Sequence, residues 1–248
     1  MMTTRMITRA FFSLLIICTM LPVQAQQSDA LAGAWHTREG DVEQTAVFVD
    51  GYLSHTTYDL KNKKFIATRG GTYTTDDNNL TVTWQYDTQK AAAEAPVDTW
   101  LGQSATFTVE TADNGLTTDL SGMHATWKRV DANEGPIAGV WRITGRKQDD
   151  KMGQMPLRDR RTLKILSGTR FQWVAINIGT GEFSGTGGGT YTFENGKYTE
   201  NIEFFSRDNS RVGASLSFDG KIEDGDWHHS GLSSTGNPIY EIWSKLEQ

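Results

Sequence analysis

The five residues GGTYT occur twice in this chain, at 70–74 and at 188–192. The first copy reads RGGTYT over 69–74, and the second reads GTGGGTYT over 185–192. A glycine-rich stretch binds phosphate when it lies between a strand and a helix, because backbone N–H groups then point at the anion. Here the next residues, FENGKYTENIEFF, alternate like a strand and lack the Lys-Ser/Thr pair of a P-loop. The glycines are therefore interpreted as part of a strand, at a bulge or a sharp bend.

Two further pairs of landmarks show that a whole unit is repeated. LAGAW at 31–35 corresponds to IAGVW at 137–141, and WKR at 127–129 corresponds to WSK at 243–245. The second copy is longer, and its extra residues fall in the polar stretch GRKQDDKMGQMPLRDR. We therefore predict two copies of one unit, 31–130 and 137–248. They are joined by the short segment DANEGP, so we expect them to pack together.

Each copy is predicted to be all-β. In the second copy, strand-like segments alternate with the turn signals ENGK, RDNS, DGK and TGNP. The predicted strands are 139–146, 161–167, 169–177, 182–193, 197–206, 212–219, 221–230 and 238–245. Only QKAAAEA, before Pro96, has helical composition. Eight up-and-down strands predict a small closed barrel in each copy, which leaves no unpaired sheet edge. One sandwich built from both copies is the alternative.

A Gly-x-Trp motif opens each copy and a basic residue closes it. Gly33 and Trp35 are matched by Arg129 or Lys128, while Gly139 and Trp141 are matched by Lys245. This pattern resembles lipocalin-like (calycin) barrels. The resemblance implies that the tryptophan closes the base of the barrel with the cation across its ring, a contact worth about 0.5–2 kcal/mol.

The second copy also resembles a group of exported bacterial lipocalin-like proteins. The stretches that carry this resemblance are SGTRFQW, GTGGGTYT, NIEFFSRDNSRVGASLSF and DGDWHHSG. It implies the fold and export from the cell, and it implies no particular activity.

The first 25 residues are predicted to be a signal peptide. Arg5 and Arg9 precede the apolar run AFFSLLIICTMLPV, and the cleavage-site residues VQA end at Ala25. The run is too short for a bilayer span of about 20 residues. We therefore expect a periplasmic or secreted protein without a membrane anchor.

The only cysteine, Cys18, lies inside this predicted signal. Ile17 precedes it, whereas a bacterial lipid-attachment site has a small residue there. The processed chain would then contain no thiol, which excludes disulfides, thiolate metal sites and a cysteine nucleophile.

Charge limits the class of partner. The chain has 24 Lys+Arg and 30 Asp+Glu residues, a formal net charge of -6. An acidic chain is a poor general partner for nucleic acid or for anionic membranes. The expected partner is a small molecule, with a protein partner of the first barrel as a further possibility.

No metal or cofactor is expected. His228 and His229 are adjacent, so on a strand they point to opposite faces and at most one can enter a given site. Metal sites need three or four converging ligands, and no His-Glu-x-x-His motif occurs in the sequence.

Candidate site residues come from comparing the copies. Glu200 and Glu203 stand where the first copy has Val82 and Gln85, so the fold does not require these charges. The ligand-binding candidates are Arg170, Trp173, Glu203, Arg207, His228 and Glu241, and the catalytic candidates are His228, His229 and Glu203. Charges inside a small barrel are costly unless paired, so an inward set would indicate a polar ligand or an acid and base. The alternative is that most of these side chains are solvated on the outer face.

Three functions follow from these patterns. The first is an exported binding protein for a small apolar or sugar-like molecule, with its cavity in the second barrel. The second is an enzyme, a lyase, isomerase or hydrolase of a sugar or small metabolite, that uses His228 or His229 with Glu203 and Arg207. The third is an interaction module without a cavity that docks through exposed aromatic residues.

Overall fold

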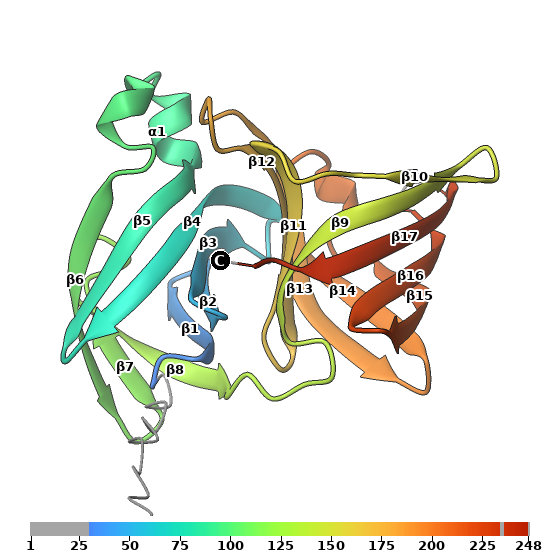
Figure 1. Cartoon of the computed structure of the whole chain (residues 1–248). Coiled ribbons are helices and arrows are strands. Elements are labelled where there is room, and N and C mark those ends of the chain that lie inside the picture. Colours follow the sequence, from blue (N-terminus) through green and yellow to red (C-terminus); the bar gives the residue numbers. More distant parts are fainter. Residues whose placement is uncertain (1–29, 234–235, 248) are drawn as a thin grey trace, which may run out of the picture.

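The computed structural model describes residues 30–233 and 236–247, so the predicted signal peptide and Cys18 lie outside the described residues. The chain forms two closed eight-stranded antiparallel barrels in tandem (Figure 1). The predicted fold class is therefore confirmed, and the single sandwich is excluded.

Barrel 1 contains eight strands in sequential order, and β1 also pairs with β8 to close it. Its strands are β1 (Gly33–Glu39), β2 (Val42–Val49), β3 (Tyr52–Asp59), β4 (Lys64–Asp76), β5 (Asn79–Asp87), β6 (Ser104–Ala112), β7 (Gly115–Thr118) and β8 (Ala125–Asp131). The only helices of this barrel are short: α1 (Thr88–Ala92), which lies in the segment of helical composition, and the 3-10 turn η1 (Val97–Thr99).

Barrel 2 repeats this order and adds one strand. It consists of β9 (Gly139–Gln148), β11 (Arg160–Leu166), β12 (Arg170–Asn177), β13 (Phe183–Glu194), β14 (Lys197–Phe205), β15 (Ser215–Glu223), β16 (Asp226–Leu232) and β17 (Pro238–Lys245). The pairing of β9 with β17 closes it. The extra residues form β10 (Lys151–Gln154), which extends β9 as a hairpin, and the 3-10 turn η2 (Asn209–Arg211) follows β14.

One predicted turn is wrong. Residues 219–221, DGK, do not turn the chain but continue β15, which pairs with β16 through Gly220. A Cβ at Gly220 would lie 2.6 Å from the ring of Phe193, so this glycine makes room for a neighbouring side chain. The turn comes at Asp224 and Gly225, both of which have positive φ angles. An Asp-Gly pair favours the tight hairpin turn that needs this conformation.

The repeated glycines lie at the same bulge in both barrels. The register of β4 against β5 shifts between Gly70 and Gly71, and that of β13 against β14 shifts between Gly188 and Gly189. A Cβ at Gly71 would lie 1.9 Å from the Thr83 carbonyl oxygen. The predicted bulge is therefore confirmed, and the close approach of two backbones explains why glycine is needed.

In each barrel a cation lies over the ring of the Gly-x-Trp tryptophan, as the resemblance implied. Trp35 and Trp141 are both buried, and each indole N–H donates to a backbone carbonyl four residues earlier. The guanidinium of Arg129 lies 4.1 Å from the Trp35 ring centre, and the Lys245 ammonium lies 4.7 Å from that of Trp141. Of the two candidate cations in the first copy, Arg129 is the one over the ring.

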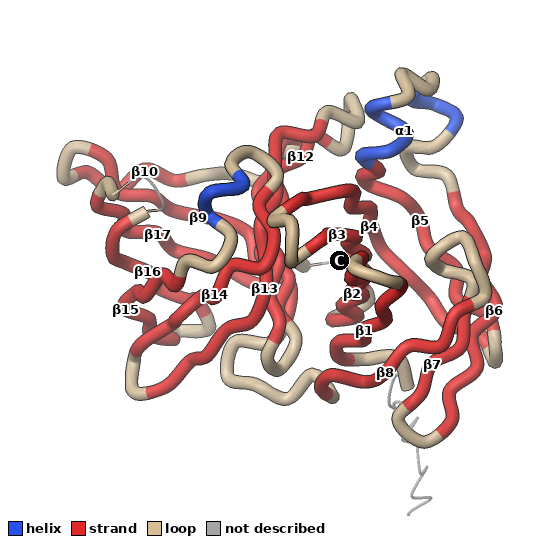
Figure 2. The backbone as a smooth tube through the Cα atoms, turned by 180° about the vertical axis from the view of Figure 1, so that it is seen from behind, coloured by secondary structure: helices blue, strands red, loops and turns tan. Residues whose placement is uncertain are grey.

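The barrels pack side by side (Figure 2). Strands β2 and β3 of barrel 1 lie against β11 and β12 of barrel 2. A buried apolar layer between them includes Val47, Tyr52, Leu163 and Val174. In its midst, the Gln172 amide accepts hydrogen bonds from the barrel 1 hydroxyls of Ser54 and Thr56. It donates to the hydroxyls of Thr68 in barrel 1 and Thr186 in barrel 2. The expected packing of the two copies is thus confirmed.

Candidate functional site

The strand registers assign an equivalent in barrel 1 to each inward position of barrel 2. Four such positions are charged or titratable in barrel 2 and small and uncharged in barrel 1. The pairs are Lys164 for Ala46, Glu200 for Val82, His229 for Thr118, and Glu241 for Ala125. All four side chains of barrel 2 are buried, at 2–6% exposure. Barrel 1 closes with uncharged residues at these positions, so the fold does not require the four charged or titratable residues of barrel 2.

Lys164 and Glu200 form a buried ion pair at the centre of barrel 2. The ammonium lies 2.7 Å from a carboxylate oxygen of Glu200. The same ammonium lies 4.6 Å from the ring centre of Tyr198 and 5.0 Å from that of Trp227. Aromatic faces and one carboxylate therefore replace the water around this cation.

His229 and Glu241 form a second polar group beside this pair. Nδ1 of His229 lies 3.6 Å from Oε2 of Glu241, beyond hydrogen-bond length but within electrostatic reach. Glu241 also lies 2.6 Å from the Arg146 guanidinium and accepts a hydrogen bond from the Trp243 indole. Burial alone would raise the pKa of Glu241, but His229 and Arg146 lower it to about 2. Glu241 is therefore ionised at neutral pH.

His229 is buried without a hydrogen bond. Neither ring nitrogen has a hydrogen-bond partner among the described residues. Burial lowers the pKa of His229 below its ordinary value, and the charge on Lys164 lowers it further against the opposing pull of Glu241. The ring is thus neutral at pH 7 and has one N–H donor and one acceptor to offer. A buried polar group left unpaired is costly, and its partner is often a bound water or ligand.

A cavity of about 250 Å³ lies against these side chains. Its polar lining comes from Lys164, Glu200, His229 and Glu241, together with Arg146, Thr162 and Ser233. Its apolar wall is formed by Ile143, Trp173, Ile202, Phe205, Leu216, Phe218, Ile239 and Trp243. Apolar walls with a few placed polar groups are typical of small-molecule sites.

Glycines of the repeated motif help to open this cavity. Gly187 occupies the position of Arg69 in barrel 1, and a Cβ there would lie 2.7 Å from both Trp173 and Phe205. In barrel 1 the Arg69 side chain instead lies inside, 4.8 Å from the ring centre of Trp84. Barrel 1 therefore has an arginine side chain in its interior at this position, whereas the glycine of barrel 2 leaves room for Trp173 and Phe205.

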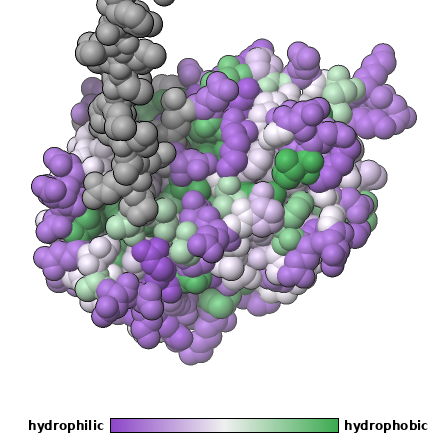
Figure 3. Space-filling model, turned by 60° about the horizontal axis from the view of Figure 1, so that its bottom comes forward, coloured by the Kyte–Doolittle hydropathy of each residue, from purple (hydrophilic) through white to green (hydrophobic). Residues whose placement is uncertain are grey.

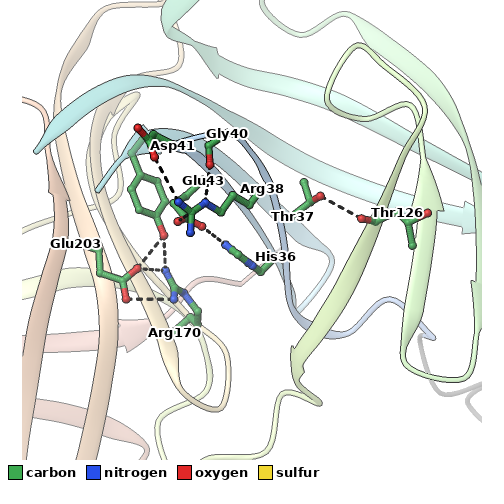
Figure 4. Close-up of polar contacts among 10 residues, drawn as sticks. His36, Thr37, Arg38, Gly40, Asp41, Glu43, Thr126, Arg170 and Glu203 are labelled. Carbon is green, nitrogen blue, oxygen red and sulfur yellow. Dashed lines mark hydrogen bonds and ion pairs between the residues drawn. The ribbon is translucent and has the colours of Figure 1, made fainter. Parts of the chain in front are cut away.

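Arg170 and Glu203 are not in the cavity. They form an ion pair on the outer face of barrel 2 (Figure 4), where the Tyr58 hydroxyl of barrel 1 accepts a hydrogen bond from Arg170 and donates one to Glu203. Glu203 is the extra residue of the β14 bulge, and Arg170 lies next to the inward Phe171. Their expected place beside a ligand is corrected to a place in the contact between the barrels.

The remaining candidates lie in three places. His228 is half-buried on the opposite face from His229, and its Nδ1 lies 2.8 Å from the Tyr240 hydroxyl. Trp173 lines the cavity, and Arg207 lies exposed outside it, 5.7 Å from the Trp173 ring centre. Of the six predicted ligand-binding residues, the structure therefore places Trp173 and Glu241 at the cavity, together with the catalytic candidate His229.

Three residues of the site, Lys164, Arg146 and Glu200, were not among the candidates named from the sequence, although the charge of Glu200 was recognised as one that the fold does not require. Lys164 lies between Leu163 and Ile165, so alternation alone puts it on the face opposite these apolar residues. Because the equivalent residue in the first copy is Ala46, the comparison of the two copies could have identified Lys164 as a charge that the fold does not require. Arg146 lies in the polar extra stretch, and only the longer β9 brings it to Glu241.

Two searches of the described ranges, 30–233 and 236–247, gave negative results. They contain no helix long and apolar enough to cross a membrane. Within them, no three or more His, Cys, Asp or Glu side chains come together in a way that could hold a metal ion. No protein-family model matches the chain, and no curated protein is significantly similar to it.

Proposed function

We propose that this chain is an exported, lipocalin-like binding protein that holds a small molecule in barrel 2. The observation that carries this proposal is His229, a buried imidazole that makes no hydrogen bond to the described residues and faces a cavity of about 250 Å³. In this role His229 supplies a neutral donor and acceptor for a polar group of the ligand. The apolar wall contacts the rest of the molecule, and barrel 1 serves as a scaffold.

The buried charges support a polar cavity rather than a purely structural core. Burying an ion pair is a weak source of stability, because the cost of removing charges from water offsets their attraction. Barrel 1 closes with Ala46 and Val82 at the positions of Lys164 and Glu200. A ligand that interacts with this pair would account for its presence in one barrel only.

An enzyme is the second candidate, and the pairing of His229 with Glu241 favours it. A neutral histidine beside an ionised carboxylate is the arrangement of a general base and its orienting group. In this alternative His229 moves a proton to or from a substrate in the cavity. Replacement of His229 by Asn would abolish turnover and keep binding in an enzyme, whereas in a binding protein it would weaken binding.

An interaction module that docks through exposed aromatics receives less support. The large hydrophobic side chains exposed on the described residues are Leu60, Ile66, Val97, Met123, Val130, Met152, Met155, Leu157, Ile222 and Leu232, and none is aromatic. On the face in Figure 3, outside the part covered in grey, hydrophobic side chains form separate small patches among hydrophilic ones. This face offers no continuous apolar surface.

A pair of variants that exchange residues between the barrels tests the binding function. Ile202 in the cavity wall occupies the position of Trp84 in barrel 1. We expect the neutral fluorescent probe N-phenyl-1-naphthylamine to bind once per chain. The I202W variant should lose this binding because the indole fills the cavity, whereas W84I in barrel 1 should retain it.

A folding control separates a blocked cavity from a damaged protein. Overpacking a core costs about 1–3 kcal/mol, so I202W should still unfold cooperatively in urea. In the same assay, a bound ligand at 100 times its Kd should add about 2.7 kcal/mol to the wild-type stability. Absence of probe binding in the wild type, or equal binding in I202W, would contradict a ligand cavity in barrel 2.

A further inference from the structure

Arginines gather at one side of the barrel 2 cavity. A larger hollow of about 620 Å³ is lined by Arg146, Arg158, Arg160, Arg161 and Arg207, and none of its described lining residues is acidic. The chain as a whole has a net charge of -6, so this hollow runs against its overall composition. The clustered positive charge would concentrate anions there.

Most of these arginines have no anionic partner among the described residues. Arg146 pairs with Glu241, but the other four form no ion pair with a carboxylate of the described residues. Arg207 donates to the Ser184 backbone carbonyl, and Arg161 donates to the carbonyl of Arg158. The side chains of Arg158 and Arg160 are exposed. Guanidinium groups present several donors in a plane, which suits carboxylate, phosphate or sulfonate oxygens.

The arginine hollow adjoins the cavity, because the two share part of their lining. Ile143, Arg146, Thr162 and Trp173 line both. Arg207 also lies over the Trp173 ring, which forms part of the cavity wall. A molecule whose apolar body lies against Trp173 can therefore extend a charged group toward the arginines. The β9–β10 hairpin that carries Arg146 and leads into Arg158 has no counterpart in barrel 1.

We propose that the ligand of barrel 2 is a small organic anion, with its apolar ring in the cavity and its anionic group at the arginine hollow. This inference rests on the proposed binding function and names the class of its ligand. The cavity volume of about 250 Å³ fits a ring-sized body rather than a long-chain lipid. The polar group nearest His229 sets orientation, while the arginines select for negative charge.

Two probes with the same rings and different charge test this inference. The probes are 1-anilinonaphthalene-8-sulfonate and the neutral N-phenyl-1-naphthylamine, each titrated by fluorescence at low and high salt. We expect the sulfonate to bind more tightly than the neutral probe, with an affinity that falls as salt rises. The R158Q/R160Q variant should weaken sulfonate binding about tenfold and leave the neutral probe unchanged.

A charge-matched variant and a single substitution control for net charge and for folding. K61Q/K128Q removes two exposed charges from barrel 1 and should not alter sulfonate binding. R207Q should weaken sulfonate binding by itself. Arg158 and Arg160 are exposed, so their replacement should not disturb folding. Equal sulfonate affinity and salt dependence in wild type and R158Q/R160Q would overturn the anion inference. If the neutral probe also fails to bind the wild type, the binding function itself is wrong.

Discussion

The two barrels share their strand order, their glycine bulge and their tryptophan base, but the contents of their interiors are reversed. Barrel 1 has small uncharged residues at its centre and polar groups toward one end, where His55, Arg69 and Asp87 line a hollow of about 260 Å³. Barrel 2 has charges at its centre and places Trp173, Gly187 and Phe205 at the positions of those three residues. The same barrel fold thus accommodates polar groups at different positions of its interior.

The polar groups that line the barrel 1 hollow have hydrogen-bond partners in the protein, whereas one polar group of the barrel 2 cavity, His229, has none among the described residues. Nε2 of His55 lies 3.0 Å from the side-chain oxygen of Gln44, and Arg69 donates to the Leu120 carbonyl. His229 in barrel 2 has no such bond among the described residues. A buried polar group therefore indicates a ligand site only when it lacks hydrogen bonds within the protein.

The largest expected effect comes from breaking the central ion pair. K164M leaves Glu200 buried without its partner, which should lower the free energy of unfolding by about 3–5 kcal/mol. The double variant K164M/E200L gives barrel 2 an uncharged centre, like that of barrel 1, and should recover to within about 1 kcal/mol of the wild type. Urea unfolding of the single and double variants measures this. A double variant as unstable as K164M would show that barrel 2 needs the pair in order to fold.

Alanine at the shared bulge should destabilise both barrels alike. A Cβ at Gly71 or Gly189 would lie 1.9 or 2.0 Å from a carbonyl oxygen of the neighbouring strand. We expect G71A and G189A each to cost about 3 kcal/mol in urea unfolding. G153A is the control, because a Cβ there lies 3.5 Å from its nearest neighbour, and it should cost less than about 0.5 kcal/mol. Similar losses in all three would refute a special role for the bulge.

The buried histidines should make stability depend on pH below 6.5. Burial, with a smaller effect from Arg69, lowers the pKa of His55 to about 3. The unfolded chain therefore takes up a proton at His55 as pH falls from 6.5 toward 3, and the folded chain does not. Stability is full above pH 6.5 and should fall by about 1.4 kcal/mol per pH unit below it. His229 acts in the same direction.

The matching measurement compares unfolding free energies at pH 7.5 and pH 5.5. The H55Q variant should lose about 1.4 kcal/mol less than the wild type over this interval. Ligand binding should separate the two histidines, because only His229 faces the proposed cavity. A pH dependence in H55Q as steep as that of the wild type would show that His55 takes up its proton in the folded state.

The smallest effect concerns the cations at the barrel bases. R129M and K245M each remove a cation from a tryptophan face and should each cost about 1 kcal/mol. Arg129 also donates to the carbonyls of Ala30 and Ala32, whereas Lys245 pairs with Asp50 of barrel 1. Calorimetry of the two variants should therefore show a barrel 1 defect for R129M and a weakened contact between the barrels for K245M. K245R should keep wild-type stability, since it retains the charge over the ring.

The success of sequence-based prediction differs sharply between the fold and the site. Turn signals, strand alternation and the repeated GGTYT predicted two barrels because these features act through local backbone geometry. The resemblance predicted a cation over Trp35 with Arg129 and Lys128 as its two candidates, and the structure places Arg129 there. Glu203 was misplaced because it is the extra residue of the β14 bulge, and Lys164 was overlooked because neighbouring apolar residues made its strand look like plain core.

By itself the sequence determined the number of units, their strands and the glycines at which the sheets bend. It also determined which charges belong to the second copy alone, because residues at the same distance from a shared motif can be compared between the two copies. Only the tertiary structure decided which of those charges meet. Closing a barrel brings β11, β14, β16 and β17 around one interior, and it joins Lys164, Glu200, His229 and Glu241 across 78 positions of sequence. Packing against barrel 1 removes Arg170 and Glu203 from that set, since their outward face is covered by a neighbouring surface that no local pattern describes.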